Sequence, residues 1–344
     1  MLSSRRQDPI LHSSHSVIPL LLVLALSVAL GACGDTDSPL APGGADEALV
    51  TADDAPQASA PEALITALTS PRIAFSSYRN SNNDIYLMDP KGYQVKRMTT
   101  PSTWEGSPSW SWDNKRIALV RPRKDASNVT HYDIYLINAD GTNGHWARST
   151  PSPYNLAAPT WHPDGSHVMV TVTREDGRWY VGWLHLASGV IANFGIGGQA
   201  VLGKQPSYDA TGQRIVYVST SASKYSLDVV NANGSGHMTL LSSSGPTIDG
   251  PAFSPDGKRI AFSNVASNGD QEIFVKSLVD GSVKRLTYAT GTDLWPSWSP
   301  DGTKIVFSST RNGQLQIWSM SATGGSATRI SHNSYAERTP AYSH

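Results

Sequence analysis

The sequence predicts an all-β protein, a six-bladed β-propeller of four-stranded blades whose ring is closed by the C-terminal strand joining the N-terminal blade. Three observations predict it. Charged residues make up only 16% of the 344 residues, whereas 29 Gly and 22 Pro supply many turns, a composition that disfavours coiled coils and long exposed helices. A sequence motif recurs about every 45 residues through the larger part of the chain. Finally, the repeat region begins and ends with incomplete copies that complement one another.

Residues 1–32 are predicted to be a lipoprotein signal peptide. Arg5 and Arg6 precede an apolar run over residues 17–30, and this order is typical of secretory signals. The run, about 14 residues long, is short for a membrane span. It ends in Leu30–Cys33, sequence LGAC, which resembles the bacterial lipobox. That resemblance implies cleavage before Cys33 and attachment of lipid, palmitate included, to its sulfur. A plain secretory signal with an incidental cysteine, or an uncleaved anchor, is the alternative.

The same region carries two further expectations. Cys33 is the only cysteine, so the chain forms no internal disulfide and no cysteine-rich metal site. The residue after it is Gly34 rather than Asp, which favours the outer membrane, facing the periplasm, over the inner membrane. Residues 33–70 contain seven acids and no base among many Ala, Pro and Ser. This composition buries too little apolar surface to fold, so we expect a lipidated, disordered tether.

Residues 71–344 hold the repeats, so they form the predicted propeller domain. The motif reads PAFSPDG at Pro251–Gly257 and PSWSPDG at Pro296–Gly302, and weaker copies precede them. The first prolines of the copies are Pro108, Pro159, Pro206, Pro251, Pro296 and Pro340. This domain carries a surplus of only five positive charges, too few over such a length to suggest nucleic acid. We expect a monomeric propeller.

Each repeat contains the same pieces in the same order. In the fifth repeat a first strand ends at Phe253, and the PDG turn supplies a fixed φ and a left-handed residue. Strands are then predicted over 259–263, 272–276 and 283–287, with an Asp-Gly hairpin turn before the last. Four strands in about 45 residues is the length of a propeller blade.

The two ends of the repeat region predict how the ring closes. The last copy stops after a first-strand segment at 340–343, and the region begins with a second-strand segment at 72–77. Together they make one blade, with the C-terminus as its innermost strand and residues 72–99 as the other three. Such pairing leaves no open edge between the first and last blades. An open solenoid or a stacked sandwich does not account for complementary half-repeats.

The repeats resemble those of the TolB-type propeller family. The resemblance covers residues 71–344 and rests on the copies FSPDGKRIAF at 253–262 and WSPDGTKIVF at 298–307, followed in the fifth repeat by the sequence RLT at 285–287. It implies the propeller fold, because similar repeats occur in TolB, in the propeller halves of prolyl oligopeptidases and in many surface proteins. TolB itself is periplasmic and binds a peptidoglycan-associated lipoprotein through its propeller. The chain departs from TolB because a lipobox and a tether stand where TolB has an α/β domain. No partner-binding residue of TolB is therefore carried over.

Known catalytic motifs are absent from the sequence. It contains no G-x-S-x-G nucleophile elbow and no H-E-x-x-H zinc motif. His162 and His167 flank a predicted blade turn, where we expect them to be exposed rather than convergent, so no metal site is predicted there. The glycines at 195, 197 and 198 precede no helix, which argues against a phosphate loop.

Three carboxylates are predicted to lie at the mouth of the central channel. They occupy the position three residues before the repeat proline in the second, sixth and closing blades, and they are Glu105, Asp293 and Glu337. Arg338, Trp104 and Trp295 are close to them in sequence and complete the candidate binding surface. The carboxylates could bind Ca²⁺ or a basic group of a partner. They could instead accept hydrogen bonds from backbone N–H groups of their own or a neighbouring blade's loop. No other cofactor is expected.

The function favoured by these observations is binding rather than catalysis. We expect a lipid-anchored, periplasmic module of the bacterial cell envelope that binds another envelope protein. The alternative is a ligand receptor or an enzyme that uses the channel, directed at a carbohydrate or a lactone and possibly metal-dependent, with Glu105, Asp293 and Glu337 as metal ligands or as acid and base. An aromatic residue recurs in every repeat and is expected to pack between blades: Trp110, Trp161, Tyr208, Phe253, Trp298 and Tyr342.

Overall fold

The computed structural model describes residues 71–79, 81–220, 224–243, 245 and 247–344. The predicted signal peptide (1–32) and tether (33–70), with Cys33, lie outside the described residues. The described part of the chain consists of strands, turns and loops and contains no helix. It accordingly holds no helix long and apolar enough to cross a membrane.

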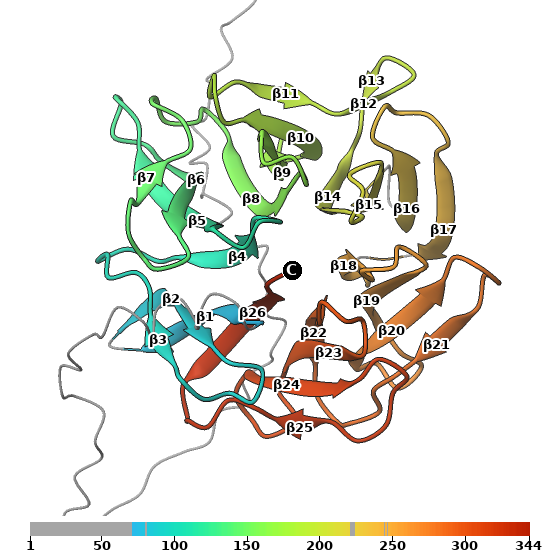
Figure 1. Ribbon diagram of the computed structural model, residues 1–344. Coiled ribbons are helices and arrows are strands. Elements are labelled where there is room, and N and C mark those ends of the chain that lie inside the picture. The colour runs from blue at the N-terminus through green and yellow to red at the C-terminus, as the bar shows by residue number, and fades with distance from the viewer. Residues whose placement is uncertain (1–70, 80, 221–223, 244, 246) are drawn as a thin grey trace, which may run out of the picture. The chain divides into compact units, whose positions relative to one another are not determined.

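Six four-stranded antiparallel sheets form the six predicted blades, arranged around a central axis (Figure 1). From the axis outward, blade 1 contains β26 (Ala336–Tyr342), β1 (Ile73–Arg79), β2 (Asn82–Met88) and β3 (Lys96–Arg97). Blade 2 contains β4 (Gly106–Trp110), β5 (Arg116–Lys124), β6 (Thr130–Asn138) and β7 (His145–Trp146). Blade 3 contains β8 (Asn155–Trp161), β9 (His167–Thr173), β10 (Trp179–His185) and β11 (Ile191–Asn193).

The second half of the ring has the same order. Blade 4 contains β14 (Gly203–Tyr208), β15 (Arg214–Ser219), β16 (Tyr225–Asn231) and β17 (Met238–Ser243). Blade 5 contains β18 (Asp249–Phe253), β19 (Arg259–Val265), β20 (Gln271–Ser277) and β21 (Val283–Arg285). Blade 6 contains β22 (Asp293–Trp298), β23 (Lys304–Ser309), β24 (Gln316–Ser321) and β25 (Thr328–Arg329).

The ring closes as the half-repeats predict. The C-terminal strand β26 pairs with β1, with Tyr342 opposite Ile73 and Ala336 opposite Tyr78. The innermost strands contact one another in the cyclic order β26, β4, β8, β14, β18, β22 and back to β26. Figure 1 shows the C-terminus among these innermost strands. Closure by main-chain pairing therefore removes the free sheet edge at both ends of the repeat region.

The core consists of six apolar clusters, and each one joins two neighbouring blades. The middle strands supply most of it because both faces of a blade are covered by the next blades. In β1, for example, five consecutive residues from Ile73 are buried. The recurring aromatic residues at the ends of the first strands are all buried at these junctions, as expected. Burial on both faces explains the continuous apolar runs in the second strands.

A bulge interrupts the innermost strand of every blade, and the sequence did not predict it. The register shifts in each pairing between a first and a second strand. The residue just before each repeat proline has a positive φ, and these six residues are Ser107, Ala158, Gln205, Gly250, Trp295 and Thr339. The bulge bends each strand at the channel wall. The proline tolerates this position because its missing N–H is not needed there.

Two details differ from the sequence prediction. In blade 5 the second and third strands are longer than predicted, and the fourth ends at Arg285 rather than at Thr287. Thr287 leaves the ladder because its hydroxyl accepts a hydrogen bond from the Ile273 N–H (2.9 Å). Between blades 3 and 4 the chain forms an additional hairpin, β12 (Gly195–Ile196) and β13 (Gln199–Ala200), whose Gly-Gly turn has positive φ at both residues.

Candidate functional site

The three candidate carboxylates lie at one end of the propeller, on consecutive blades. Glu105 precedes β4, Asp293 begins β22 and Glu337 lies near the start of β26, so all three are at the same end of the innermost strands. Their exposed fractions are 0%, 1% and 0%. We call this end, where the innermost strands begin, the mouth face. The three residues lie at the predicted end of the innermost strands, but their side chains are buried in the protein and not exposed at the channel.

Each buried carboxylate forms an ion pair with an arginine of its own blade. The pairs are Glu337 with Arg79 (2.9 Å), Asp293 with Arg311 (2.8 Å) and Glu105 with Arg121. Two further side chains donate hydrogen bonds to these carboxylates. Asn333 donates to Glu337 (2.8 Å), and Thr99 donates to Glu105. The expected structural partners were backbone N–H groups, and the arginines take that role instead. An arginine near the end of the second strand in the same three repeats was the available sequence signal.

Burial dominates the electrostatics of two of these carboxylates. It raises the pKa of Glu105 and of Glu337 above the ordinary value of a glutamate, because removal from water penalises the charged form. The paired arginines oppose this effect and lower the pKa only in part. Enclosed in this way, the carboxylates hold arginines in place, while Oε2 of Glu337 is buried without a hydrogen-bond partner among the described residues.

A second set of carboxylates repeats the arrangement further from the axis. Glu272, on β20, is buried and pairs with Arg285 (2.6 Å), and Thr287 donates to its other oxygen (2.5 Å). Burial raises the pKa of Glu272 as well. On β2, Asp84 pairs with Arg97 in the same way (2.7 Å). Sequence analysis missed this role, although the RLT motif supplies both the arginine and the threonine.

Two of the paired arginines in turn support exposed tyrosines. The Arg79 guanidinium lies 5.2 Å from the ring centroid of Tyr335, and that of Arg285 lies 4.4 Å from the ring centroid of Tyr288. Tyr335 is 45% exposed and Tyr288 is 71% exposed. Both tyrosines precede an innermost strand, so both lie on the mouth face. Buried carboxylate, arginine and exposed tyrosine thus form the same chain of contacts at two places.

The remaining candidates occupy different depths at this face. Arg338 is half-buried, which lowers its pKa, and it forms no ion pair with any described residue. The Trp295 indole N–H donates to Asp249 (3.1 Å), across the junction between blades 6 and 5. Trp104 packs edge-on against Tyr132, with ring centroids 5.7 Å apart, and belongs to the apolar cluster between blades 2 and 3. The tryptophans therefore stabilise junctions as well as bordering the face.

Two histidines at the opposite end correct a prediction. His162 and His167 were expected to be exposed rather than convergent, and that expectation is wrong. Their rings stack with centroids 4.4 Å apart, and His167 is also close to the Tyr208 hydroxyl (3.2 Å). They converge because the β8–β9 turn is tight, so the residues on its two sides face each other across the strand pair.

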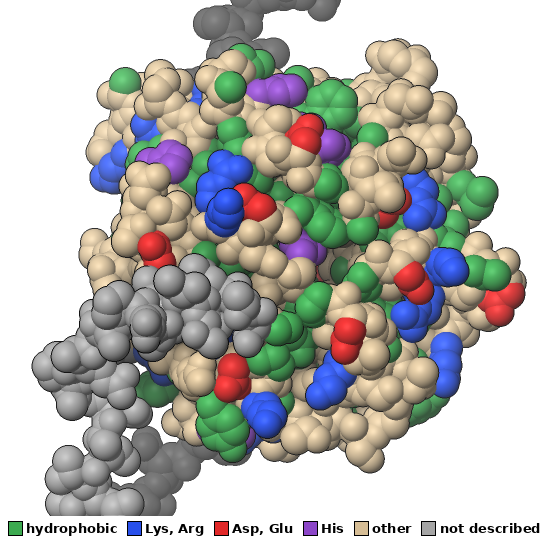
Figure 2. All heavy atoms as spheres, viewed as in Figure 1, with side chains coloured by type: hydrophobic (Ala, Val, Ile, Leu, Met, Phe, Trp, Pro, Cys, Tyr) green, Lys and Arg blue, Asp and Glu red, His purple; other side chains and the backbone are tan. Residues whose placement is uncertain are grey.

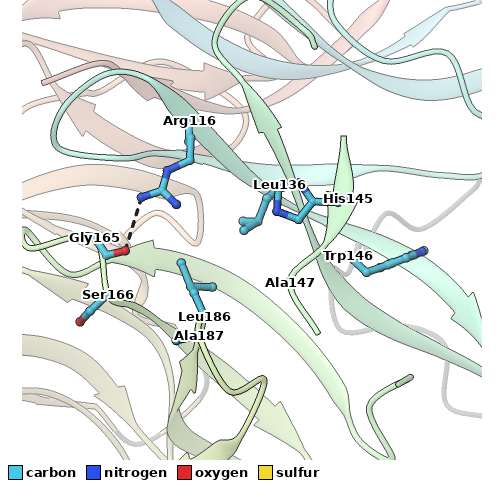
Figure 3. Close-up of a pocket in the computed structure, with 9 residues that line it drawn as sticks. All are labelled: Arg116, Leu136, His145, Trp146, Ala147, Gly165, Ser166, Leu186 and Ala187. Atoms are coloured by element: carbon cyan, nitrogen blue, oxygen red, sulfur yellow. Dashed lines mark hydrogen bonds between the residues drawn. The ribbon is translucent and has the colours of Figure 1, made fainter. Parts of the chain in front are cut away.

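A shallow groove lies beside this turn, between blades 2 and 3 (Figure 3). Its volume is about 410 Å³. Its lining combines residues of β5, β6 and β7 with the β8–β9 turn and the segment after β10, and Arg116 crosses it to donate to the Gly165 carbonyl (3.4 Å). Ser166 is one of the lining residues, and its hydroxyl lies 2.8 Å from the Nδ1 of His167.

Comparison with known proteins agrees with this architecture. A family model described as the TolB beta propeller domain matches residues 63–248 and 205–344. The crystal structure of TolB from Acinetobacter baumannii is similar over 82% of this chain and 70% of that chain, with a TM-score of 0.67 and 21% identity. The crystal structure of a nidogen/laminin complex contains a chain that is similar over 80% of this chain and 98% of its own, with a TM-score of 0.59 and 9% identity.

A curated relative matches a shorter part of the sequence. An uncharacterized peptidase of Bacillus subtilis (strain 168), YuxL, is 27% identical over 144 residues, which is 38% of this chain and 20% of that protein. The chain thus spans about a fifth of the length of this relative. The likenesses to solved structures establish the fold, and the family model covers most of the sequence. The chain therefore belongs to the TolB β-propeller domain family.

Proposed function

We propose that the protein is a non-catalytic protein-binding module of the bacterial cell envelope. It is held at the outer membrane by a lipid on Cys33, faces the periplasm and binds another envelope protein through the mouth face. Support comes from membership of the TolB propeller family, whose TolB members are periplasmic envelope proteins. The lipobox and the acidic 33–70 segment support the anchor and the tether.

The observation that carries the proposal is the pair of exposed tyrosines backed by buried ion pairs. Large exposed aromatic residues are frequent at the centres of protein interfaces, where a rigid ring buries much area at little entropic cost. Here the guanidinium of Arg79 lies against the ring of Tyr335, and that of Arg285 lies against the ring of Tyr288. Each arginine is held by an ion pair with a buried carboxylate. Arg338, unpaired among the described residues, offers a carbonyl or carboxylate of the partner a donor at the channel.

Catalysis at the mouth carboxylates is the weaker candidate. An acid or base must reach its substrate within hydrogen-bond distance, and Ca²⁺ needs several oxygen ligands. The carboxyl groups of Glu105, Asp293 and Glu337 are enclosed, and each is paired with an arginine. A receptor or enzyme that uses the channel would have to rely on other groups. The peptidase relative of Bacillus subtilis supports catalysis little, because the match covers only a fifth of its length.

The test is crosslinking of the full-length protein in a bacterial envelope, followed by solubilisation and capture. The parent is compared with a Tyr288→Ala/Tyr335→Ala variant, which leaves the buried ion pairs intact. The matched control is Tyr93→Ala, because Tyr93 is similarly exposed (58%) but lies between β2 and β3 at the opposite end. All three proteins must unfold at the same denaturant concentration.

We expect one envelope protein to be enriched with the parent and with Tyr93→Ala, and to be reduced at least about tenfold with the double variant, since two interface tyrosines each contribute about 1 kcal/mol or more. The same captured proteins with all three chains would contradict a role for the mouth face. No enrichment over a lipoprotein of unrelated fold would overturn the binding function itself.

A further inference from the structure

Blade 3 departs from the other blades at the turn between its first two strands. The residue after the recurring aromatic is a serine in four blades (Ser111, Ser254, Ser299, Ser343), and in blade 3 it is His162. The residue that begins the second strand is an arginine in three blades (Arg116, Arg214, Arg259), and in blade 3 it is His167. Both departures place an imidazole beside the same turn carboxylate, that of Asp164.

The two imidazoles and the carboxylate converge at this turn. The Nδ1 of His162 lies 2.8 Å from Oδ1 of Asp164. Ser166 donates to the same oxygen (2.7 Å), and its hydroxyl lies 2.8 Å from the Nδ1 of His167. One potential ligand atom of each residue, two imidazole nitrogens and a carboxylate oxygen, lies within 4.8 Å of the other two. Among the described residues, this is the group of such side chains that gathers most closely.

A third histidine borders the cluster. His185, on β10, stands opposite His167 in the strand register, and their ring centroids are 5.6 Å apart. The cluster is accessible, because the side chains of His162 and Asp164 are 22% and 56% exposed. Figure 2 shows histidine side chains at the surface over β10 and β11, and others elsewhere on the same face.

We propose that His162, Asp164 and His167 form a binding site for a divalent transition-metal ion of the zinc class, with water or His185 as the fourth ligand. Imidazole and carboxylate are the ligands that zinc and its neighbours accept, and calcium or magnesium would require more oxygens. Zinc holds such ligands at about 2.0–2.2 Å, so donor atoms around it are separated by roughly 3.3 Å. Small rotations of the partly exposed His162 side chain and the exposed Asp164 side chain bring the donor atoms to this separation.

Both histidines contact Tyr208 of the next blade, but histidine is not required at these two positions for a turn or a blade junction to form. In the other blades the serine bonds the turn aspartate, as Ser254 does with Asp256 (2.5 Å), and the arginine clamps the next blade, as Arg259 does. The turn and the blade junction are therefore built without histidine elsewhere in the same ring. This also supplies a structurally neutral test, because the residues of the other blades can be placed in blade 3.

The test uses the untagged protein, freed of metal with a chelator, and Zn²⁺ alone as the probe. Calorimetric titration and thermal unfolding with and without Zn²⁺ are compared for the parent and for a His162→Ser/His167→Arg variant. Asp164→Asn is a second variant that keeps the turn hydrogen bonds. His145→Ala is the matched control, since His145 is an exposed histidine outside the cluster.

We expect one zinc ion to bind the parent and His145→Ala, with a rise in melting temperature. Affinity should fall about tenfold or more in both cluster variants, whose melting temperatures without zinc stay near that of the parent. Absence of saturable binding to the parent would overturn the proposal. Equal affinity of the parent and the cluster variants would overturn it as well, because the ion would then bind elsewhere.

Discussion

The guanidinium of Arg259 lies 4.6 Å above the indole ring of Trp298, which belongs to the next blade. The same guanidinium donates to the carbonyl of Gly302 in that blade's turn (3.3 Å). Arg116 and Arg214 form the equivalent contacts in two other blades. In these three blades the arginine that begins the second strand therefore fastens its blade to the following one.

Arg259→Ala should destabilise the propeller by about 1–2 kcal/mol, because a cation–π contact and a charged hydrogen bond across a blade junction are lost together. Arg259→Lys should recover only part of this, since an ammonium group cannot stack and donate in the same geometry. Urea unfolding of both variants measures the effect. Lys258→Ala, at the exposed neighbouring position, is the control and should change the free energy of unfolding little. Equal losses in the two alanine variants would contradict the clamp.

Because the ring is closed, we expect the protein to tolerate circular permutation, in which the two termini are joined and the chain is opened in another loop. The Ser343 N–H donates to the Arg72 carbonyl (2.8 Å), so a short linker from residue 344 to residue 71 joins β26 directly to β1. A permuted chain that starts between β25 and β26 should fold cooperatively with a stability close to that of the parent. Removal of residues 336–344 should instead cause aggregation, because β1 becomes an open edge. Cooperative unfolding of the truncated monomer, seen by circular dichroism and light scattering, would refute this role of β26.

The pH dependence of stability tests the burial of Glu337. Its pKa is raised above its ordinary value by burial, so the native protein binds the proton more tightly than the unfolded chain. The contribution of this group to stability therefore falls as the pH rises from the ordinary value through the raised one. The Glu337→Gln substitution removes this pH-dependent contribution, because the amide does not titrate. Relative to the parent, the variant should gain stability as the pH rises above the ordinary pKa of a glutamate. A parallel pH dependence in both proteins would contradict the shift, and Glu175→Gln, at an exposed position, is the control.

The proposed anchor predicts the behaviour of Cys33. In a bacterial host the full-length protein should incorporate radioactive palmitate and sediment with the outer membrane. Cys33→Ser should lose the label and release the mature chain or leave it unprocessed, because Cys33 is the only cysteine. Label retained in this variant would rule out lipidation at Cys33. Label in the inner-membrane fraction of the parent would rule out only the outer-membrane assignment.

Strand order, blade number and closure were predictable because they depend on local patterns. The PDG turns and the alternation of apolar residues recur in each repeat, and the half-repeats at the two ends leave one pairing that completes the ring. The candidate site was predictable only along the axis. Glu105 and Glu337 were placed at the correct end of their strands, but whether a side chain faces a channel or an arginine depends on the twist and bulge of the strand, which no local pattern reports.

The class of fold, the number of blades and the position of the candidate residues along their strands follow from local sequence patterns, since turn chemistry and periodicity act between near neighbours. Which groups meet depends on how the blades pack against one another. This packing encloses Glu337 with Arg79, sets Tyr335 above that arginine, and brings His162 and His167 to one carboxylate. These contacts join strands or turns whose relative twist is set by packing between blades, so their geometry emerges when the ring closes.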